Sequence, residues 1–291
     1  MKRVDFHMHT THSDGSYTPR ELMRSCKEKN LACVSVTDHD TMSSFEACEI
    51  EARNLGIELI PGIEISAQFE PGTLHILGFF LNRTHPELNA RLEEIQKARR
   101  ERNPQVIEKL NRLGIAITLE EVERESARGT AERPGAQQIG RPHFAKALLA
   151  KGAVKSLQEA FDQYLAKGRP AYVDKRRLTS REAIQMINDA GGIASVAHPK
   201  QMRLDRAALE KEIGRMVSEG LGAMEVYHSC QGPAENKIYL AITQHFGLAV
   251  TGGSDFHGAN KPGVDLGCLG ENVCLGYEMV EALRERIRRR K

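Results

Sequence analysis

The chain has no tryptophan, and its aromatic side chains amount to only 5% of 291 residues. This scarcity argues against a broad surface on which successive nucleic-acid bases stack. The formal net charge is +2, so a surface that coats nucleic acid generally is not expected, although a local basic cleft is compatible with it. No apolar run approaches the roughly 20 residues that span a bilayer, so we expect no transmembrane helix.

Closely spaced cysteine pairs are absent as well. Six cysteines occur, and none of them forms a C-x-x-C motif. In a chain of this length without a secretory signal we interpret them as reduced, mostly structural thiols. The first residues lead directly into a strand pattern rather than into the apolar core of a signal peptide. Together these features predict a soluble cytoplasmic protein with no membrane partner and no obligate protein partner.

Histidine is more informative than charge, because the eleven histidines fall mainly where apolar runs end. His7 and His9 follow the first such run and are separated by one residue. On a strand this spacing points both imidazoles to the same side. Two neutral imidazoles on one side are half of a site for a first-row metal ion. Asp14 follows in a turn, where Gly15 lets the backbone bend sharply.

Strand and helix patterns alternate in both end regions of the chain. Seven strands are predicted, most of them followed by a helix, at residues 4–6, 31–36, 57–60, 73–80, 193–197, 221–227 and 248–251. This order is typical of a parallel (β/α) barrel, an α/β fold whose chemistry lies at the carboxyl ends of the strands. Pro61-Gly62 is expected to end the third strand just before Glu64.

Almost every predicted strand ends in a histidine or a carboxylate. Nine such groups would converge on one mouth of the barrel: His7, His9, Asp14, His39, Glu64, His75, His198, Asp255 and His257. Unpaired, they would be very costly to bury, whereas bound cations would satisfy them. Nine ligands exceed one tetrahedral site, so we expect two or three metal ions. His75 and His198 alone would also suit a core, but their context favours metal binding.

The strand patterns stop at about Pro86 and return near residue 174. Helical periodicity replaces them, which predicts a barrel of residues 1–85 and 174–291 and a helical insertion of residues 86–173 that caps the substrate. Within the insertion, Pro104 is expected to begin a new helix, and Thr118 and Glu121 to form a capping box. Residues 128–138, which are rich in glycine, alanine and arginine, are expected to form a mobile loop.

Several motifs together resemble the polymerase-and-histidinol-phosphatase (PHP) superfamily of metallophosphoesterases. They are His7-x-His9-Thr10-x-x-Ser13-Asp14-Gly15, Thr37-Asp38-His39-Asp40, Glu64, the His75 segment, His198-Pro199 and Ser254-Asp255-x-His257. The insertion, with residues 140–145 and 164–173, is similar to the branch that contains 3',5'-nucleoside-bisphosphate phosphatases and 5'→3' exoribonucleases. The resemblance implies a distorted seven-stranded barrel that holds a trinuclear metal site.

The resemblance also implies how the ligands divide. One metal would lie on His7, His9, Glu64 and Asp255, a second on Glu64, His75 and His198, and a third on Asp14, His39 and His257. It implies catalytic roles for Asp14, His39, Glu64, Asp255 and His257. Manganese is the expected ion, with zinc or iron as alternatives, because histidine and carboxylate ligands do not choose sharply among them. Asp38 and Asp40 are interpreted as supporting residues rather than ligands.

The implied function is a metal-dependent phosphoesterase that removes the 3'-phosphate from nucleoside 3',5'-bisphosphates such as 3'-phosphoadenosine 5'-phosphate. Clustered cations would neutralise the phosphate dianion and activate a bridging water for in-line attack. Basic residues of the insertion would clamp the second phosphate, and the candidates are Arg99, Arg141, Lys167 and Arg169. The same charges would also suit a solvated helix face, so this assignment depends on where the insertion folds.

Two other functions remain open, and a third, hydrolysis of histidinol phosphate, is disfavoured by the large insertion. If a strand enters with its 5'-phosphate anchored, the protein is a 5'→3' exoribonuclease on short 5'-phosphorylated RNA. If turnover is lacking, it is a metal-binding accessory module, against which the complete ligand set argues. His12 and His228 are undecided between loop residues and substrate contacts, while His143 is expected to pack or cap within the insertion. Tyr172 would either stack on a base or pack as a hydrophobic side chain.

Overall fold

The computed structural model describes residues 2–127, 138–174, 176–267, 269 and 273–289. Its centre is a sheet of seven strands in the spatial order of the chain. The strands are β1 (Arg3–Asp5), β2 (Leu31–Val36), β3 (Glu58–Ala67), β4 (Leu74–Phe79), β5 (Ile193–Val196), β6 (Ala223–His228) and β7 (Ala249–Gly253). Beyond β1 and β7 the two edges meet, because Asp255 N donates to His7 O at 2.7 Å and His9 N donates to Phe256 O at 2.9 Å. The predicted seven-stranded barrel is confirmed, and it is nearly closed.

β4 runs antiparallel to both of its neighbours, β3 and β5, whereas the other adjacent strands are parallel. The expectation of a uniformly parallel barrel is therefore wrong at this strand. Only residues 68–73 separate β3 from β4, and a parallel return needs a crossover of about a dozen residues or more. The resulting hairpin pairs Ser66 with His75 and makes Glu64 and His75 diagonal neighbours on one face.

β3 passes through Pro61-Gly62, so the prediction that the strand ends there is wrong. At this point β3 changes partner: residues 58–61 pair with β2, and residues 62–67 pair with β4. Pro61, which has no N–H to donate, therefore lies at the end of the hydrogen-bond ladder between β2 and β3. A Cβ atom on Gly62 would lie 2.8 Å from Val36 O, so only glycine allows this close approach. Glu64 consequently lies within a strand and is held rigidly.

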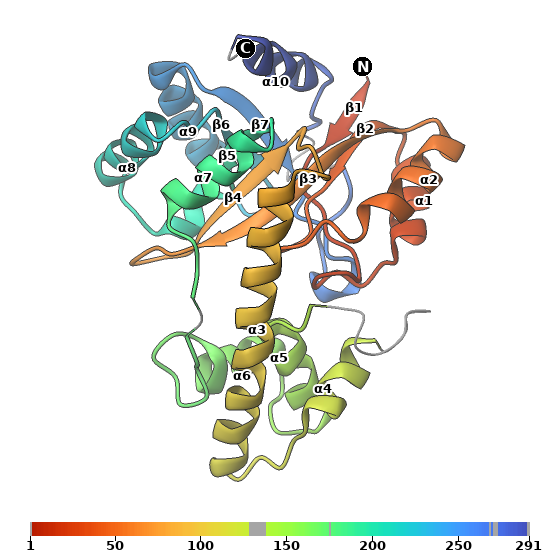
Figure 1. Cartoon of the computed structure of the whole chain (residues 1–291), viewed down its shortest axis with the longest axis vertical. Helices are drawn as coiled ribbons and strands as arrows, with labels where there is room; N and C mark the ends of the chain where they lie inside the picture. The colour runs from red at the N-terminus through yellow and green to blue at the C-terminus, as the bar shows by residue number, and fades with distance from the viewer. Residues whose placement is uncertain (1, 128–137, 175, 268, 270–272, 290–291) are drawn as a thin grey trace.

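Helices cover the outside of the sheet (Figure 1). They are α1 (Pro19–Glu28), α2 (Phe45–Leu55), α7 (Ser180–Asp189), α8 (Arg206–Ser218), α9 (Pro233–Phe246) and α10 (Glu278–Arg288), with short 3₁₀ turns at η2 (Pro199–Met202) and η3 (Gly258–Asn260). α1 starts as predicted, with a capping box between Thr18 and Glu21. α2 ends at Gly56, whose φ of 68° favours glycine. The apolar faces of these helices pack on the strands and form the core.

The insertion consists of α3 (Pro86–Arg112), α4 (Leu119–Ser126), α5 (Arg141–Ala150), α6 (Leu157–Ala160) and the π-helix η1 (Phe161–Leu165). Figure 1 shows α3 leaving the sheet and extending into a lower lobe that contains the other insertion helices. Leu88 and Leu92 near the start of α3 pack in the barrel core. Val106 and Leu110 near its end pack in a separate core with Phe144. One helix therefore fixes the insertion over the barrel.

Pro104 lies inside α3, so the prediction that it begins a new helix is wrong. Proline costs an interior hydrogen bond, but Val106 and Leu110 are buried on the same helix and stabilise its continuation. The predicted capping box between Thr118 and Glu121 is confirmed at the start of α4. Packing of an apolar face thus outweighs a local signal that would end the helix.

The remaining expectations concern cysteines, one loop and membrane helices. Five cysteines are free, and burial raises the thiol pKa of three of them, which fits the structural interpretation: Cys26, Cys33 and Cys48. Cys268 and residues 128–137 of the expected loop lie outside the described residues. None of the helices within the described ranges is long and apolar enough to cross a membrane.

Candidate metal centre and adjacent anion cavity

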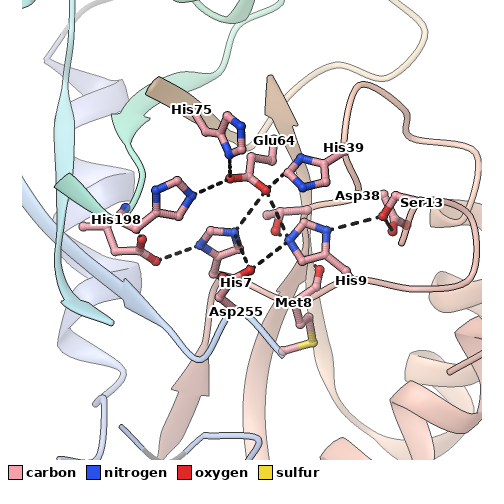
Figure 2. A network of polar contacts seen from close by, with 12 residues as sticks. His7, Met8, His9, Ser13, Asp38, His39, Glu64, His75, His198 and Asp255 are labelled. Carbon is pink, nitrogen blue, oxygen red and sulfur yellow. Dashed lines mark hydrogen bonds and ion pairs between the residues drawn. The ribbon is translucent and has the colours of Figure 1, made fainter. Parts of the chain in front are cut away.

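Histidine and carboxylate side chains meet at one end of the barrel (Figure 2), and the nine predicted ligands among them come from six of the seven strands. His7 and His9 follow β1, His39 follows β2, and His198 follows β5. Asp255 and His257 follow β7, Glu64 and His75 belong to the β3–β4 hairpin, and Asp14 lies in the loop after β1. The structure thus brings together all nine residues that the sequence predicted as ligands. The carboxyl ends of parallel strands, together with one hairpin, supply them.

Glu64 lies at the centre of this cluster and is fully buried. Five imidazoles surround its carboxylate. Its Oε2 atom lies 3.3 Å from His7 Nε2, 3.2 Å from His9 Nε2 and 3.1 Å from His39 Nδ1. Its Oε1 atom lies 2.7 Å from His75 Nδ1 and 3.0 Å from His198 Nε2. A carboxylate with ligand groups around both oxygens has the arrangement of a bridge between cations.

Two further carboxylates flank Glu64. The Oδ1 atom of Asp255 lies 3.2 Å from His9 Nε2 and 3.4 Å from His257 Nδ1. Its Oδ2 atom lies 2.6 Å from Lys261 Nζ and 3.2 Å from His228 Nε2. Asp14 lies on the other side, with Oδ1 at 3.2 Å from His257 Nε2. Imidazoles therefore lie between the three carboxylates.

The backbone is strained at two of the ligand positions. His198 has a φ of 26° and Asp255 a φ of 55°, although neither is glycine. Such conformations persist where surrounding contacts over-determine them, and they concentrate at functional sites. Both backbone N–H groups are held, that of His198 by Glu225 Oε2 at 2.6 Å and that of Asp255 by His7 O at 2.7 Å. These bonds aim the two ligand side chains into the cluster.

Buried polar atoms of this cluster lack hydrogen-bond partners among the described residues. They are His7 Nε2, His9 Nε2, Asp14 Oδ1, His39 Nδ1, Glu64 Oε2, His198 Nδ1 and His228 Nε2. Unsatisfied buried polar groups are expensive and rare. Here the atoms lie close to one another in sets of three or four that fit within a coordination sphere, such as His9, Asp14, His39 and His257. Nitrogen and oxygen donors in this arrangement suit first-row divalent cations, so the residues fit the expected metals.

The charges of the cluster are coupled. Burial alone would raise the carboxyl pKa of Glu64, but His39, His75 and His7 hold that pKa well below its usual value. Burial lowers the pKa of His39 to about 4, which favours the neutral imidazole that binds metals. Burial would also lower the pKa of His9, yet Asp255 and Glu64 raise it to about 10. Without cations, protons on some imidazoles therefore balance the carboxylates.

Comparison with known proteins shows the family to which this chain belongs. The family model for the PHP domain matches residues 5–225 of the chain. The chain belongs to the PHP domain family. It is similar to the 5'-3' exoribonuclease Rnm of Escherichia coli, with 34% identity over 90% of this chain and 87% of that protein. It is also similar to the 3',5'-nucleoside bisphosphate phosphatase of Chromobacterium violaceum, with 31% identity over 92% and 91% of the two chains.

A solved structure gives the same result for the fold. An amidohydrolase from Chromobacterium violaceum, determined with bound sulfate and no metal, superposes on this PHP domain with a TM-score of 0.84. The two chains are 30% identical, and the match covers 98% of this chain and 96% of the other. The fold and the ordered set of predicted metal ligands therefore agree with membership of the family. PHP domain proteins are metal-dependent phosphoesterases, and the chain is a hydrolase of phosphoester bonds.

Buried carboxylates support the ligand loops of this PHP domain. Asp38 accepts hydrogen bonds from Thr10 Oγ1 at 2.7 Å, Ser13 Oγ at 2.6 Å and Ser44 Oγ at 2.5 Å, in keeping with its expected supporting role. Glu225, on β6, lies 2.9 Å from His7 Nδ1. Sequence reasoning missed Glu225, although it stands between apolar residues of a strand as Glu64 does. That shared pattern was the signal that could have found it.

The histidines left open by the sequence separate into three environments. His228 is buried beside Asp255 and therefore borders the metal centre. His12 lies in a loop, with its Nδ1 atom 2.7 Å from Ser43 Oγ. His143 is buried in the insertion, where its Nδ1 atom accepts a hydrogen bond from Gly140 N at 2.9 Å. The prediction that His143 packs or caps within the insertion is confirmed.

A cavity of about 350 Å³ adjoins the metal centre and separates it from the insertion. On the barrel side its lining includes Asp14, His39 and His75. Its lining also includes four arginines: Arg99, Arg102 and Arg141 of the insertion, and Arg177 from the segment that follows it. The volume lies at the lower end of the range of about 300–1,000 Å³ for small-molecule sites. The arrangement can receive an anion that reaches from the arginines to the metal ligands.

Two of the four arginines lack a carboxylate partner in the described part of the chain. Among the described residues, Arg99 pairs with Asp40 and Arg177 pairs with Asp174, whereas no carboxylate in those ranges pairs with Arg102 or Arg141. Burial, together with the neighbouring arginines, lowers the guanidinium pKa of Arg102 to about 9. Its Nε atom is buried and has no hydrogen-bond partner among the residues that the structure describes. A phosphate bound in this cavity would satisfy these donors.

The four basic residues predicted to bind substrate occupy two kinds of place. Arg99 and Arg141 line the cavity. Lys167 pairs with Glu70 on the surface, and Arg169 is exposed; neither lines the cavity. Sequence reasoning missed Arg102 and Arg177, because only the packing of α3 against the segment after η1 shows which arginines face inward.

Proposed function

We propose that this protein removes the 3'-phosphate from 3',5'-nucleoside bisphosphates, giving a nucleoside 5'-phosphate and inorganic phosphate. The observation that carries the proposal is the cavity itself, whose lining combines predicted metal ligands with four arginines. A substrate with two phosphates, one at each end of a ribose, matches two separate anion-binding surfaces. A relative that covers almost the whole chain is a phosphatase of this substrate class.

The nine ligand residues would hold two or three divalent cations, with manganese expected first. When bound, such cations neutralise a phosphate dianion and lower the pKa of water so that it is a nucleophile near neutral pH. In the proposed reaction an oxygen–phosphorus bond forms to water, the bond from phosphorus to the 3'-oxygen breaks, and that oxygen takes a proton. Glu64 lies where it would bridge, because imidazoles surround both of its oxygens.

The arginines would position the other phosphate. Arg141 is held by Tyr172, whose ring centroid lies 5.6 Å from the guanidinium carbon. The Tyr172 hydroxyl accepts a hydrogen bond from Arg177 at 3.2 Å. Tyr172 therefore orients two arginine side chains. Guanidinium groups present paired donors that fit phosphate oxygens, so a fixed pair would hold the 5'-phosphate in a single orientation.

A second candidate function is a 5'→3' exoribonuclease on short 5'-phosphorylated RNA. Two relatives at 34% and 32% identity are named 5'-3' exoribonucleases. The arginines would then anchor the terminal 5'-phosphate, and a phosphodiester would occupy the metal centre. A metal-binding module without turnover is the third candidate, and the complete ligand set with an adjoining anion cavity argues against it.

One experiment separates these functions. The manganese-loaded protein is incubated with 3'-phosphoadenosine 5'-phosphate and, separately, with a 5'-phosphorylated RNA oligomer, and phosphate and nucleotides are quantified. Release of AMP and phosphate from the bisphosphate, with the oligomer intact, supports the proposed phosphatase. Shortening of the oligomer from its 5' end supports the exoribonuclease. If neither substrate reacts with manganese, zinc or iron, both assignments are wrong.

The matched variant for this experiment is Asp14→Ala. Asp14 lines the cavity and contacts His257, so its removal should abolish turnover of whichever substrate reacts. Asp162→Ala is the control, because Asp162 is exposed on η1 and lies outside the cavity lining. Turnover that survives in purified Asp14→Ala protein contradicts the role of the metal centre.

A further inference from the structure

The cavity has a third surface, which neither the metal centre nor the arginines account for. Phe161 and Pro142 belong to its lining, beside the arginines. Apart from the two histidines of the metal centre, Phe161 is the aromatic residue among the described residues that line this cavity. It is partly buried, and it packs against the core of the insertion. An aromatic ring at a polar anion cavity calls for a role besides packing.

Phe161 begins the five-residue π-helix η1. Ala166 N donates to Phe161 O at 2.9 Å, which is the i to i+5 hydrogen bond that defines such a turn. π-helical turns are rare, and they are frequent at functional sites. Here the wider turn comes directly after α6 and lies at the position where the chain lines the cavity.

The other aromatic candidate near the cavity is already engaged. Arg141 lies over the ring of Tyr172, and Arg177 donates to its hydroxyl. Tyr172 also donates to Asp174 Oδ1 at 3.0 Å. The ring face and the hydroxyl group of Tyr172 are therefore already in contact with arginines. Phe161 carries no polar group, so its ring is suited to contact a flat, uncharged part of a ligand.

We propose that Phe161 is the stacking surface for the nucleobase of the substrate. This inference rests on the proposed function and adds a third contact to it. The metal centre would receive the 3'-phosphate, the arginines the 5'-phosphate, and Phe161 the base attached to the same ribose. Stacking on a phenyl ring is tolerant of base identity because every base has a π-face. The site would therefore select nucleotides over sugar phosphates without a strong preference among bases.

The decisive experiment compares a ligand with a base and one without it, using the manganese-loaded full chain. Binding of adenosine 5'-phosphate and of ribose 5-phosphate is measured by calorimetry for the wild type and for Phe161→Leu. Leucine keeps apolar volume for the core but removes the π-face. Loss of stacking on one base should weaken nucleotide binding about 5- to 100-fold, and binding of ribose 5-phosphate should stay unchanged.

Tyr164→Leu is the matched control. Tyr164 lies on the same π-helix and packs partly buried against the same core, but it does not line the cavity. It should leave the binding of both ligands unchanged. Equal weakening of both ligands by Phe161→Leu would show a purely structural role and overturn the proposal. Wild-type protein that binds the two ligands equally well would also overturn it.

Turnover provides the second readout. Phe161→Leu should raise KM for 3'-phosphoadenosine 5'-phosphate by a similar factor and leave kcat within about twofold, because stacking acts alike on the ground state and the transition state. KM for ribose 3,5-bisphosphate should not change. If the wild type hydrolyses neither bisphosphate, the proposed function fails, whereas the binding comparison still decides the role of Phe161.

Discussion

The His7 Nδ1 atom lies 2.9 Å from the Oε1 atom of Glu225, and both side chains are completely buried. The other ring nitrogen of His7 faces Glu64 and Asp255. Glu225 therefore determines which nitrogen of His7 is available to a metal ion. Its second oxygen accepts the backbone N–H of His198, so one carboxylate orients ligands from two strands.

Replacement of Glu225 by glutamine should weaken metal binding about 10- to 100-fold, as loss of a partner to a ligating histidine does. The amide has nearly the same size, but it lacks the negative charge that favours a proton on His7 Nδ1. Manganese affinity of purified protein, measured by calorimetry, tests this. Glu58→Gln is the control. Glu58 lies at the start of β3, at the end of that strand away from Glu64, and it contacts Tyr277 and Arg284. Equal affinities in all three proteins would contradict the role of Glu225.

Removal of the metal should lower the melting temperature. The cluster contains three carboxylates and buried polar atoms that lack hydrogen-bond partners among the described residues, and a ligand that binds only the folded state stabilises it by mass action. At a free manganese concentration of 100 times Kd the stabilisation is about 2.7 kcal/mol per site. Thermal unfolding is compared in chelator and in rising manganese. A melting temperature that is independent of manganese would rule out a cation site within this cluster.

Arg141→Gln should raise KM for the bisphosphate about 10- to 100-fold, which corresponds to the loss of charge-assisted hydrogen bonds worth about 1.5–3 kcal/mol. Arg141 lines the cavity and is oriented by Tyr172. Arg169→Gln is the control, since Arg169 is exposed and outside the cavity. Steady-state kinetics on both variants test the assignment. The cavity assignment is wrong if Arg169 matters more than Arg141.

Gly253→Ala should destabilise the barrel by about 2–4 kcal/mol. A Cβ atom at Gly253 would lie 2.2 Å from His7 Cβ and 2.4 Å from His7 N, so β1 and β7 would have to separate where they close the barrel. Gly247→Ala is the comparison, because Gly247 has a φ of 60° but open space around its Cα atom. That variant should lose only about 1–2 kcal/mol. Urea unfolding of both proteins measures the difference.

His143 makes stability depend on pH. Burial lowers its pKa to about 4 in the folded protein, whereas an unfolded histidine has a pKa of about 6.5. Between these values the unfolded chain binds a proton that the folded chain does not, so stability is lost as pH falls below about 6.5. His143→Asn keeps an acceptor for Gly140 N and does not titrate. The free energy of unfolding of the wild type, minus that of the variant, should therefore fall by up to about 1.4 kcal/mol per pH unit between pH 6.5 and pH 4.

Local patterns were sufficient to select the nine residues that the structure brings together, because most of them follow or interrupt an apolar strand. His7, His39 and His198 follow strands, and Glu64 and His75 stand among apolar residues. The direction of β4 was not found in the same way. It depends on the length of the link between two strands, and a pattern of apolar residues carries no direction.

Local signals failed where packing opposed them. Pro61-Gly62 and Pro104 are residues that usually end a strand or a helix, yet β3 and α3 continue through them. At Pro61 the strand changes its neighbour, and along α3 a buried apolar face continues on both sides of Pro104. In both cases contacts far away in the sequence supply more free energy than the local signal costs.

The sequence by itself was enough to predict a metal centre, because the types and the strand spacing of its nine histidines and carboxylates leave few other ways to satisfy polar groups that gather in one place. Only the tertiary structure decided what lies beside that centre. Arg102, Arg177 and Phe161 line the cavity, whereas Lys167 and Arg169 do not. The reason is physical: a basic or aromatic residue has the same local sequence pattern whether it faces a cavity or solvent, and only the packing of its segment decides between the two.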